Sequence, residues 1–484
     1  MSYTLNEMTV SQFHKGLNED HFTTTELVQY YLDRIEALDP KISAVICINP
    51  DALDEAARLD QYYKEHGLIG PLHGIPILVK DNFETKDLET TAGSLSLKGF
   101  IPEKDALLVD KIKNAGGIVI AKANLHEFAI WGETISSVLG QTLNPYDLTR
   151  TPGGSSGGTG AGIAADFAII GLGTDTINSV RSPASANNLV GIRPTLGLLS
   201  RSGIVPYSYT QDTAGPITRT VVDAVIALQV MRGADEADPV TLIQNDHEMG
   251  NFISSLKPEG LMNKRIGVLN ALFGKSDIHQ STNSAVRNAI ENMKEAGAII
   301  IELDTQLDTD WLVKEVSVHL HDFKDHLNHY LKSLPSYMSY HTMAEIYESD
   351  LIHPGVKSNI EQAMALSTET QAYKERLMRQ DVEREKLTAL FSEHALDAVI
   401  YPHQKQLVCK AGSSQLERNG VLGSITGYPS ICMPAGFSEP DVDAPIGVPI
   451  GMEILGLPFT EEKLIEIAFG YESKYGVRKA PVLG

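Results

Sequence analysis

Two clusters rich in glycine and serine lie close together in this 484-residue chain. The first is Gly-Gly-Ser-Ser-Gly-Gly over residues 153–158, and the second is Gly-Thr-Asp-Thr-Ile-Asn-Ser-Val-Arg-Ser-Pro over residues 173–183. Neither contains a histidine, so a reactive serine here would need another base. Lys80 follows the apolar run 75–79, and burial at a strand end would lower its pKa toward neutrality. Together these segments could supply a nucleophile, a relay and a base, which predicts a serine hydrolase that works without histidine.

The spacing of the two clusters favours their meeting in space. A predicted helix over residues 159–167 and a predicted strand over 168–172 separate Ser155 from Ser179, which can bring both serines to one end of a sheet. A lysine with its usual pKa near 10.4 is a poor proton acceptor at neutral pH, whereas a desolvated, neutral lysine accepts a proton.

A glycine-rich turn that opens a helix can also bind an anion, because it exposes backbone N–H groups at the positive end of the helix. Residues 153–158 lack the Lys-Ser/Thr ending of a P-loop and the Gly-x-Gly-x-x-Gly spacing of a dinucleotide site. Nucleotide binding is therefore disfavoured. A non-catalytic protein with an anion or ligand site stays open as an alternative from another class.

Short apolar runs alternate with helical patterns along most of the chain, which predicts an α/β fold. Runs that are apolar on both faces and separated by helices are typical of a sheet covered on both sides. The predicted strands span residues 75–79, 117–121, 168–172, 266–269, 298–301 and 398–401.

Two stretches outside this pattern are predicted to be helical. Residues 1–70 contain a helix that starts at a capping box of Thr23 and Glu26 and ends at Pro40, and a second helix near 51–66. Residues 305–395 are charged and rich in histidine, with few strand signals. We interpret them as a helical cap inserted over the sheet.

Composition excludes several classes of partner. The net charge of −22 disfavours nucleic-acid binding, and no apolar run reaches the roughly 18 residues of a membrane span. We see no secretory signal at the N-terminus. The three cysteines form no zinc spacing and no disulfide framework, so a reducing cytoplasm is expected; they are Cys47, Cys409 and Cys432.

Several segments resemble the amidase signature family, which includes fatty acid amide hydrolase, bacterial amidases and the A subunit of the tRNA-dependent amidotransferase. The resemblance covers most of the chain. It implies a single amidase domain over residues 1–484 with a catalytic signature core over 71–225, built on a central mixed, twisted sheet. The similar segments are residues 72–76, 79–82, 90–94, 144–146, 153–158, 427–430 and 447–451, together with Pro206, Asp212, Gly215, Pro216, Arg219 and Asp223.

The resemblance also implies a mechanism and roles for the site residues. Ser179 would be the acylated nucleophile, Ser155 the bridging serine after a cis peptide bond, and Lys80 the base. The reaction would convert a carboxylic amide into an acid and ammonia or an amine, with no cofactor. The oxyanion would be held by backbone N–H groups of the residues leading to Ser179, namely Thr176, Ile177 and Asn178.

Further matching positions are expected to support the loops by hydrogen bonds; they are Ser156, Asp175 and Arg181.

One departure stands out, because the family usually carries Gly-Gly where this chain has Ile177 and Asn178. Glycine tolerates positive φ and leaves space, isoleucine does neither, and asparagine can adopt left-handed conformations. A bulky Ile177 would also narrow the acyl pocket.

A glutaminase subunit of a tRNA-dependent amidotransferase, which would need partner subunits, is the competing enzyme interpretation. The Ile-Asn departure and the histidine-rich segment 319–329 favour a stand-alone amidase acting on a small-molecule amide. A homodimer is the family-level expectation for its assembly. Neither the identity of the amide nor activity on esters follows from the sequence.

Four side chains in the cap segment would share one helix face: His319, Asp322, His326 and His329. Such a face could ligate a metal. A solvated helix is the preferred interpretation, and no metal site is expected, because the proposed relay needs none.

Overall fold

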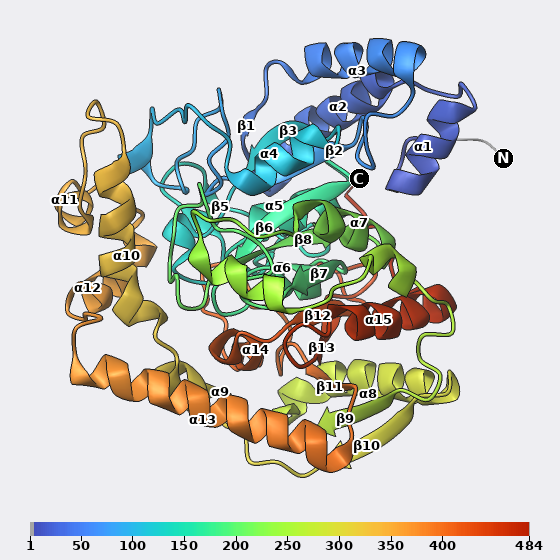
Figure 1. The fold of residues 1–484 in the computed structure, drawn as a ribbon, viewed down its shortest axis with the longest axis vertical. Coiled ribbons are helices and arrows are strands. Elements are labelled where there is room, and N and C mark those ends of the chain that lie inside the picture. The colour runs from blue at the N-terminus through green and yellow to red at the C-terminus, as the bar shows by residue number, and fades with distance from the viewer. Residues whose placement is uncertain (1–3, 484) are drawn as a thin grey trace.

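A large mixed β-sheet forms the centre of the molecule (Figure 1). The computed structural model describes residues 4–483. Within them, eleven strands pair in the order β1-β3-β2-β6-β8-β7-β12-β13-β11-β9-β10. The strands are β1 (Val45–Ile48), β2 (Pro76–Lys80), β3 (Ile118–Ala123), β6 (Ile170–Asp175), β7 (Val190–Arg193), β8 (Thr213–Thr218), β9 (Arg265–Leu269), β10 (Ile299–Leu303), β11 (Ala398–Pro402), β12 (Ser430–Phe437) and β13 (Pro449–Leu455), with β4 (Ile135–Ser136) and β5 (Gly140–Gln141) as a separate pair.

Helices cover the sheet and extend beyond it. Helices α5 and α6 pack on the sheet and on each other, as do α4, α7, α8 and α15 in a second group and α2 and α3 in a third. The helices are α1 (Val10–Asn18), α2 (Thr24–Ile42), α3 (Ala52–His66), α4 (Leu107–Asn114), α5 (Gly157–Ala164), α6 (Arg181–Ala186), α7 (Val221–Met231), α8 (Gln280–Glu295), α9 (Thr309–Trp311), α10 (His319–Ser333), α11 (Met343–Glu348), α12 (Lys357–Met364), α13 (Gln371–His394), α14 (Val421–Thr426) and α15 (Glu461–Tyr475). The predicted α/β class and mixed sheet are confirmed.

All six predicted strands are present, with ends shifted by a few residues. The capping box of Thr23 and Glu26 starts α2 as predicted, and α3 ends before Gly67. The predicted end of α2 at Pro40 is wrong, since the helix continues to Ile42. Proline removes one N–H donor from the helix. In the final turn this loss is tolerated, and α2 ends only where Ser43 turns left-handed (φ 57°).

The helices between residues 305 and 395 lie at the left and lower edges of the view in Figure 1. Helices α10, α11 and α12 share a hydrophobic cluster with loops near the sheet. Phe323 and Leu327 of α10 belong to this cluster together with Phe128 and Tyr207. The boundaries of the cap and of the signature core stay predictions.

The pairing of β2 with β6 positions the residues of interest. These strands run parallel, with Ile77 opposite Ile170, so their carboxyl ends share one edge of the sheet. Lys80 is the last residue of β2 and Asp175 is the last residue of β6. The turn after β6 leads into α6 and carries Ser179.

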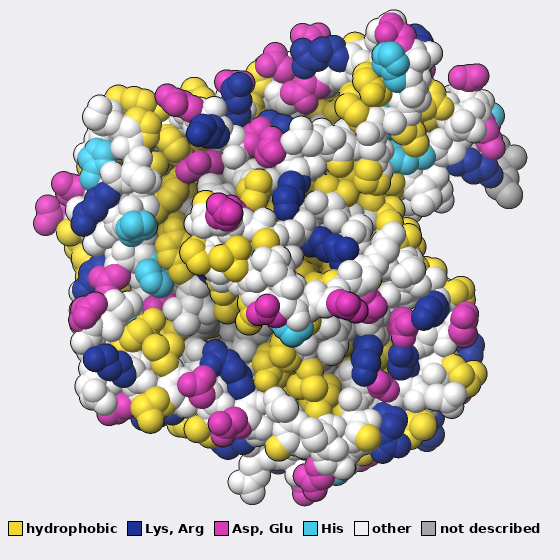
Figure 2. Space-filling model, viewed as in Figure 1, with side chains coloured by type: hydrophobic (Ala, Val, Ile, Leu, Met, Phe, Trp, Pro, Cys, Tyr) yellow, Lys and Arg dark blue, Asp and Glu magenta, His cyan; other side chains and the backbone are white. Residues whose placement is uncertain are grey.

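No helix within residues 4–483 has the length and apolarity needed to cross a membrane. On the face shown in Figure 2, acidic and basic side chains are interspersed. The excess of negative charge is therefore not gathered into one acidic region on this face.

Replacing Gly215 in β8 by alanine should destabilise the sheet. A Cβ at this position would lie 1.9 Å from the carbonyl oxygen of Ile192 in β7, so the strands would have to separate. We expect the free energy of unfolding in urea to fall by about 1–3 kcal/mol, as for other overpacked cores. The control is Gly436→Ala in β12, where the new Cβ would approach Ala285 only to 3.2 Å. Equal stability of the two variants would contradict the prediction.

Candidate active site

Lys80 is buried at the carboxyl end of β2, against two hydroxyl groups. Its Nζ lies 2.8 Å from Ser155 Oγ and 2.7 Å from Thr174 Oγ1. Both Lys80 and Ser155 are fully buried. The predicted lysine and the predicted bridging serine are therefore in direct contact, although they are far apart in the sequence.

Ser155 lies in the glycine–serine loop before α5, and the peptide bond between Gly154 and Ser155 is cis. Thr134 holds this loop on both sides of the serine. Its hydroxyl donates to the carbonyl oxygen of Gly153 at 2.7 Å and accepts from the N–H of Gly157 at 3.1 Å. A Cβ on Gly154 or Gly157 would collide with Thr134, so the bare backbone permits this close packing.

Ser179 lies in the turn between β6 and α6 and is 5% exposed. It lines a cavity of about 440 Å³. The N–H of Ser156 donates to the carbonyl oxygen of Ser179 at 3.3 Å, which joins the two predicted serine clusters. Ser156 also donates from its hydroxyl to the carbonyl oxygen of Thr174 at 3.2 Å.

Each of the three successive backbone carbonyl groups before Ser179 accepts a hydrogen bond. The carbonyl oxygen of Thr176 accepts from Ser424 Oγ at 2.6 Å. That of Ile177 accepts from Arg181 Nη2 at 2.6 Å, and that of Asn178 accepts from the N–H of Ser182 at 2.6 Å.

These contacts orient the N–H groups of the turn. In a trans peptide the N–H points away from the preceding carbonyl, and the only cis bond within residues 4–483 is at Ser155. Fixing the three carbonyls therefore turns the N–H groups of Ile177, Asn178 and Ser179 the other way. None of the three donates to an acceptor in the described part of the chain, so all can receive a developing negative charge.

The departure from Gly-Gly causes no backbone conflict, because neither Ile177 nor Asn178 has a positive φ. The turn therefore does not depend on glycine, and Asn178 does not use its left-handed capability. The side chain of Ile177 is partly buried against a hydrophobic cluster that includes Val421 and Leu422 of α14. Ile177 also lines the cavity, so it takes up space beside Ser179.

A buried network of arginine and carboxylate side chains contacts this turn. Arg181 contacts Asp175 through two nitrogens, at 3.0 and 3.1 Å, and also pairs with Glu453 of β13. Arg193 Nη1 lies 2.8 Å from Asp175 Oδ1. Burial alone would raise the pKa of Asp175, but the two guanidinium groups outweigh it and hold this pKa well below its usual range. His403 Nδ1 lies 2.8 Å from Glu453 and completes the network.

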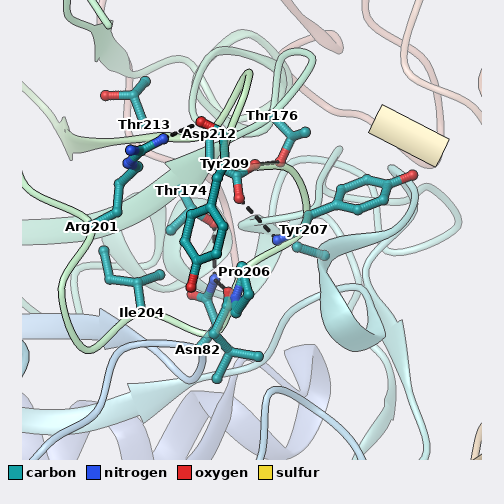
Figure 3. Close-up of a pocket in the computed structure, with 12 residues that line it drawn as sticks. Asn82, Thr174, Thr176, Arg201, Ile204, Pro206, Tyr207, Tyr209, Asp212 and Thr213 are labelled. Atoms are coloured by element: carbon teal, nitrogen blue, oxygen red, sulfur yellow. Dashed lines mark hydrogen bonds between the residues drawn. The ribbon is translucent and has the colours of Figure 1, made fainter. Parts of the chain in front are cut away.

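Burial also decides the protonation of Lys80. Desolvation lowers its pKa from 10.5 to about 7, against the opposing influence of Asp212 and Asp175. Asp212 lines the same small pocket as Thr174, the lysine's partner (Figure 3). Its carboxylate accepts from Thr176 Oγ1 at 2.6 Å and from the N–H of Tyr207 at 2.9 Å. At neutral pH a substantial fraction of Lys80 is therefore uncharged and able to accept a proton.

Sequence reasoning missed several residues around the site. Thr174 lies within the second cluster but carried no distinctive signal. Gln211, Ser424 and Glu453 reach the site from distant segments, and no spacing rule connects them to Ser179. Asp212 was noted only as part of a motif, with no role beside the lysine.

The four cap residues that share a helix face do not converge on one point. Ser208 Oγ donates to Asp322, Tyr209 N–H donates to His326, and His319 contacts Ser317. Among residues 4–483, no three His, Cys, Asp or Glu side chains are arranged to hold a metal ion.

Comparison with known proteins identifies the family of the chain. The family model described as Amidase matches residues 26–465. The chain is 32% identical to the A subunit of the glutamyl-tRNA(Gln) amidotransferase of Alkaliphilus metalliredigens, over 98% of each chain. It is 34% identical to a protein of Arabidopsis thaliana described as a probable amidase, over 99% of this chain and 92% of the other.

Among solved structures, native peptide amidase from Stenotrophomonas maltophilia superposes with a TM-score of 0.90, at 33% identity and with 99% of each chain covered. The fold and these relatives define an enzyme that hydrolyses amides. The chain belongs to the amidase signature family.

Removing Arg181 should destabilise the protein strongly. In Arg181→Met the buried carboxylates of Asp175 and Glu453 lose their shared cation, and breaking a buried ion pair costs about 3–5 kcal/mol. Urea unfolding followed by circular dichroism measures this loss. The control is Lys294→Met, which removes an ion pair with Glu291 whose side chains are 60% and 65% exposed, and which should have little effect. A similar loss in both variants would contradict this account.

Proposed function

We propose that the chain cleaves a carboxylic amide through an acyl-enzyme on Ser179, with Ser155 as relay and Lys80 as base. The observation that carries the proposal is the 2.8 Å contact between Lys80 Nζ and Ser155 Oγ, made by a lysine whose pKa is lowered to about 7. A nucleophilic serine without histidine needs such a neutral amine within reach of its proton.

In the first half-reaction, Ser179 Oγ forms a bond to the carbonyl carbon of the amide. Its proton passes to Ser155, whose own proton passes to Lys80. The carbonyl oxygen becomes an oxyanion that the N–H groups of the turn would stabilise, namely those of Ile177, Asn178 and Ser179, joined in the prediction by that of Thr176.

Collapse of this intermediate breaks the C–N bond. The proton held by Lys80 returns through Ser155 to the leaving nitrogen, which departs as ammonia or an amine. Water then attacks the acyl-enzyme by the same relay, and an acid is released with Ser179 regenerated. Protons and electrons balance without a cofactor, and Ser156, Asp175 and Arg181 act only by holding the loops.

The competing proposal is a glutaminase that acts only together with partner subunits, and it is supported by the similarity to the A subunit of the amidotransferase. Hydrolysis of simple amides by the purified chain alone would favour the stand-alone enzyme. Glutamine hydrolysis that appears only with added partner subunits would favour the alternative. The homodimer and the cytoplasmic location stay predictions.

A fluorophosphonate probe should label Ser179, because only an activated serine reacts readily with it. We expect a single adduct, located by peptide mapping, and its loss in Ser179→Ala. Lys80→Met should slow labelling by at least about 100-fold, as expected when a general base is removed. The control is Ser430→Ala, which removes a buried hydroxyl without a hydrogen-bond partner outside the proposed relay. A folded protein that is not labelled would refute the serine mechanism and favour the anion-binding alternative.

The rate of hydrolysis should rise with pH through the pKa of Lys80. Only neutral lysine accepts the proton, so kcat/KM should increase about tenfold per pH unit below pH 7 and level off above it. A pH series from 5 to 9 on one amide substrate measures the profile. A flat profile over this range would exclude Lys80 as the base.

A further inference from the structure

His319 is the first residue of α10, and its ring forms part of the wall of the cavity that Ser179 lines. The side chain is largely enclosed, with 4% of the residue exposed. The ring meets Tyr207 edge-on, with 5.5 Å between ring centroids. Packing therefore fixes the orientation of the His319 ring in the cavity. What the ring can bind depends on which of its two nitrogens faces the cavity and whether that nitrogen carries a proton.

Gln211 determines that proton's position through a short chain of hydrogen bonds. The N–H of Val318 donates to Gln211 Oε1 at 2.8 Å, which fixes the orientation of the amide. Ser317 Oγ lies 3.0 Å from the same oxygen. Ser317 is the donor in this contact, because Gln211 Oε1 carries no hydrogen. The hydrogen of Ser317 therefore points at Gln211.

Ser317 Oγ must then accept its second hydrogen bond. His319 Nδ1 lies 2.6 Å from this oxygen, so Nδ1 carries a proton and donates it. Burial lowers the pKa of His319 to about 3, helped by Arg376 and His321, so the ring is neutral near pH 7 and holds only this one proton. Nε2 consequently presents a lone pair.

No hydrogen-bond donor within residues 4–483 contacts the lone pair of His319 Nε2. Nε2 of His319 has no hydrogen-bond partner in residues 4–483, yet it is not among the polar atoms sealed off from solvent. It therefore faces the cavity. Two carboxylates also line the cavity, those of Asp310 and Glu417, but Glu417 is one-third exposed and paired with His279. Solvated acceptors of this kind discriminate weakly between ligands.

We propose that His319 Nε2 accepts a hydrogen bond from an N–H or O–H group on the part of the substrate that fills this cavity. The enzyme then prefers amides that carry such a donor in addition to the scissile amide group. The proposal rests on the proposed function, because the cavity is taken as the substrate site. A substrate without the donor displaces water from Nε2 and leaves the acceptor unpaired, which is the source of the preference.

The first test compares isosteric substrates. N-acetyl-leucinamide carries an N–H that is replaced by an ester oxygen in 2-acetoxy-4-methylpentanamide. For the wild type we expect kcat/KM to be about three- to tenfold higher for the N–H compound, as one neutral hydrogen bond allows. His319→Phe should bring the two substrates to equal rates, and His319→Gln should restore part of the preference through its amide oxygen.

The control variant is His321→Gln, which changes the neighbouring cap histidine outside the cavity lining and should keep the preference. Equal rates for the two substrates in the wild type would overturn the proposal. So would an unchanged preference in His319→Phe.

The second test observes the tautomer without any turnover. In ¹⁵N-histidine-labelled protein, His319, assigned by its loss in His319→Gln, should give the signals of a ring protonated at Nδ1 only. Addition of N-acetyl-leucinamide to Ser179→Ala should shift the Nε2 resonance, and the ester isostere should shift it less. A ring protonated at Nε2, or equal shifts with both compounds, would overturn the proposal.

The two tests separate this inference from the proposed function. If the serine mechanism is wrong, Ser179 is not labelled and hydrolysis does not depend on it, but the tautomer and the binding shifts of Nε2 can still be measured. If only this inference is wrong, hydrolysis depends on Ser179 and Lys80 while the two isosteres react alike.

Discussion

The arrangement of the site depends on the removal of Lys80 from water. A lysine in solvent is a cation, and lowering its pKa from 10.5 to about 7 corresponds to a penalty on the order of 5 kcal/mol against the charged form. The sheet supplies this environment, because Lys80 ends β2 between β3 and β6. Among residues 4–483, the hydrogen-bond partners of Nζ are two hydroxyl groups, those of Ser155 and Thr174. These can accept from or donate to a neutral amine, so the buried lysine is satisfied without a counter-ion in contact.

The turn before Ser179 is arranged so that its N–H groups could stabilise a negative charge. Its N–H groups are directed by restraints on the carbonyls behind them, and these restraints come from Ser424, Arg181 and Ser182. Arg181 can serve here because Asp175 and Glu453 hold it in a buried network. Because support comes from behind the turn, the side chains at its front are free to vary. This is consistent with Ile177 and Asn178 at the positions where the family resemblance led us to expect glycines.

Local patterns were sufficient to predict six of the eleven strands of the sheet, the two capping-box residues of α2, and the two residues of the serine–lysine contact. Each of these depends on neighbours in the sequence or on a compact motif. The partners of the turn could not be predicted, because Ser424 and Glu453 lie more than 200 residues away and are brought in by the order of strands in the sheet. The continuation of α2 past Pro40 was missed because a final helical turn tolerates a lost donor that an interior turn would not.

Gln211 connects two parts of the molecule that the sequence suggests are separate. Its Oε1 receives the N–H of Val318 and the hydroxyl of Ser317, where the cap begins α10. Its Nε2 donates to Ser424 Oγ at 2.8 Å, and that hydroxyl holds the carbonyl of Thr176. Since one amide group contacts both ends, the orientation of the proposed oxyanion turn and the proposed tautomer of His319 depend on the same side chain. A change in the cap that displaced Ser317 would thus reach the turn through Gln211, and the proposed substrate recognition and the proposed chemistry would both depend on this buried side chain.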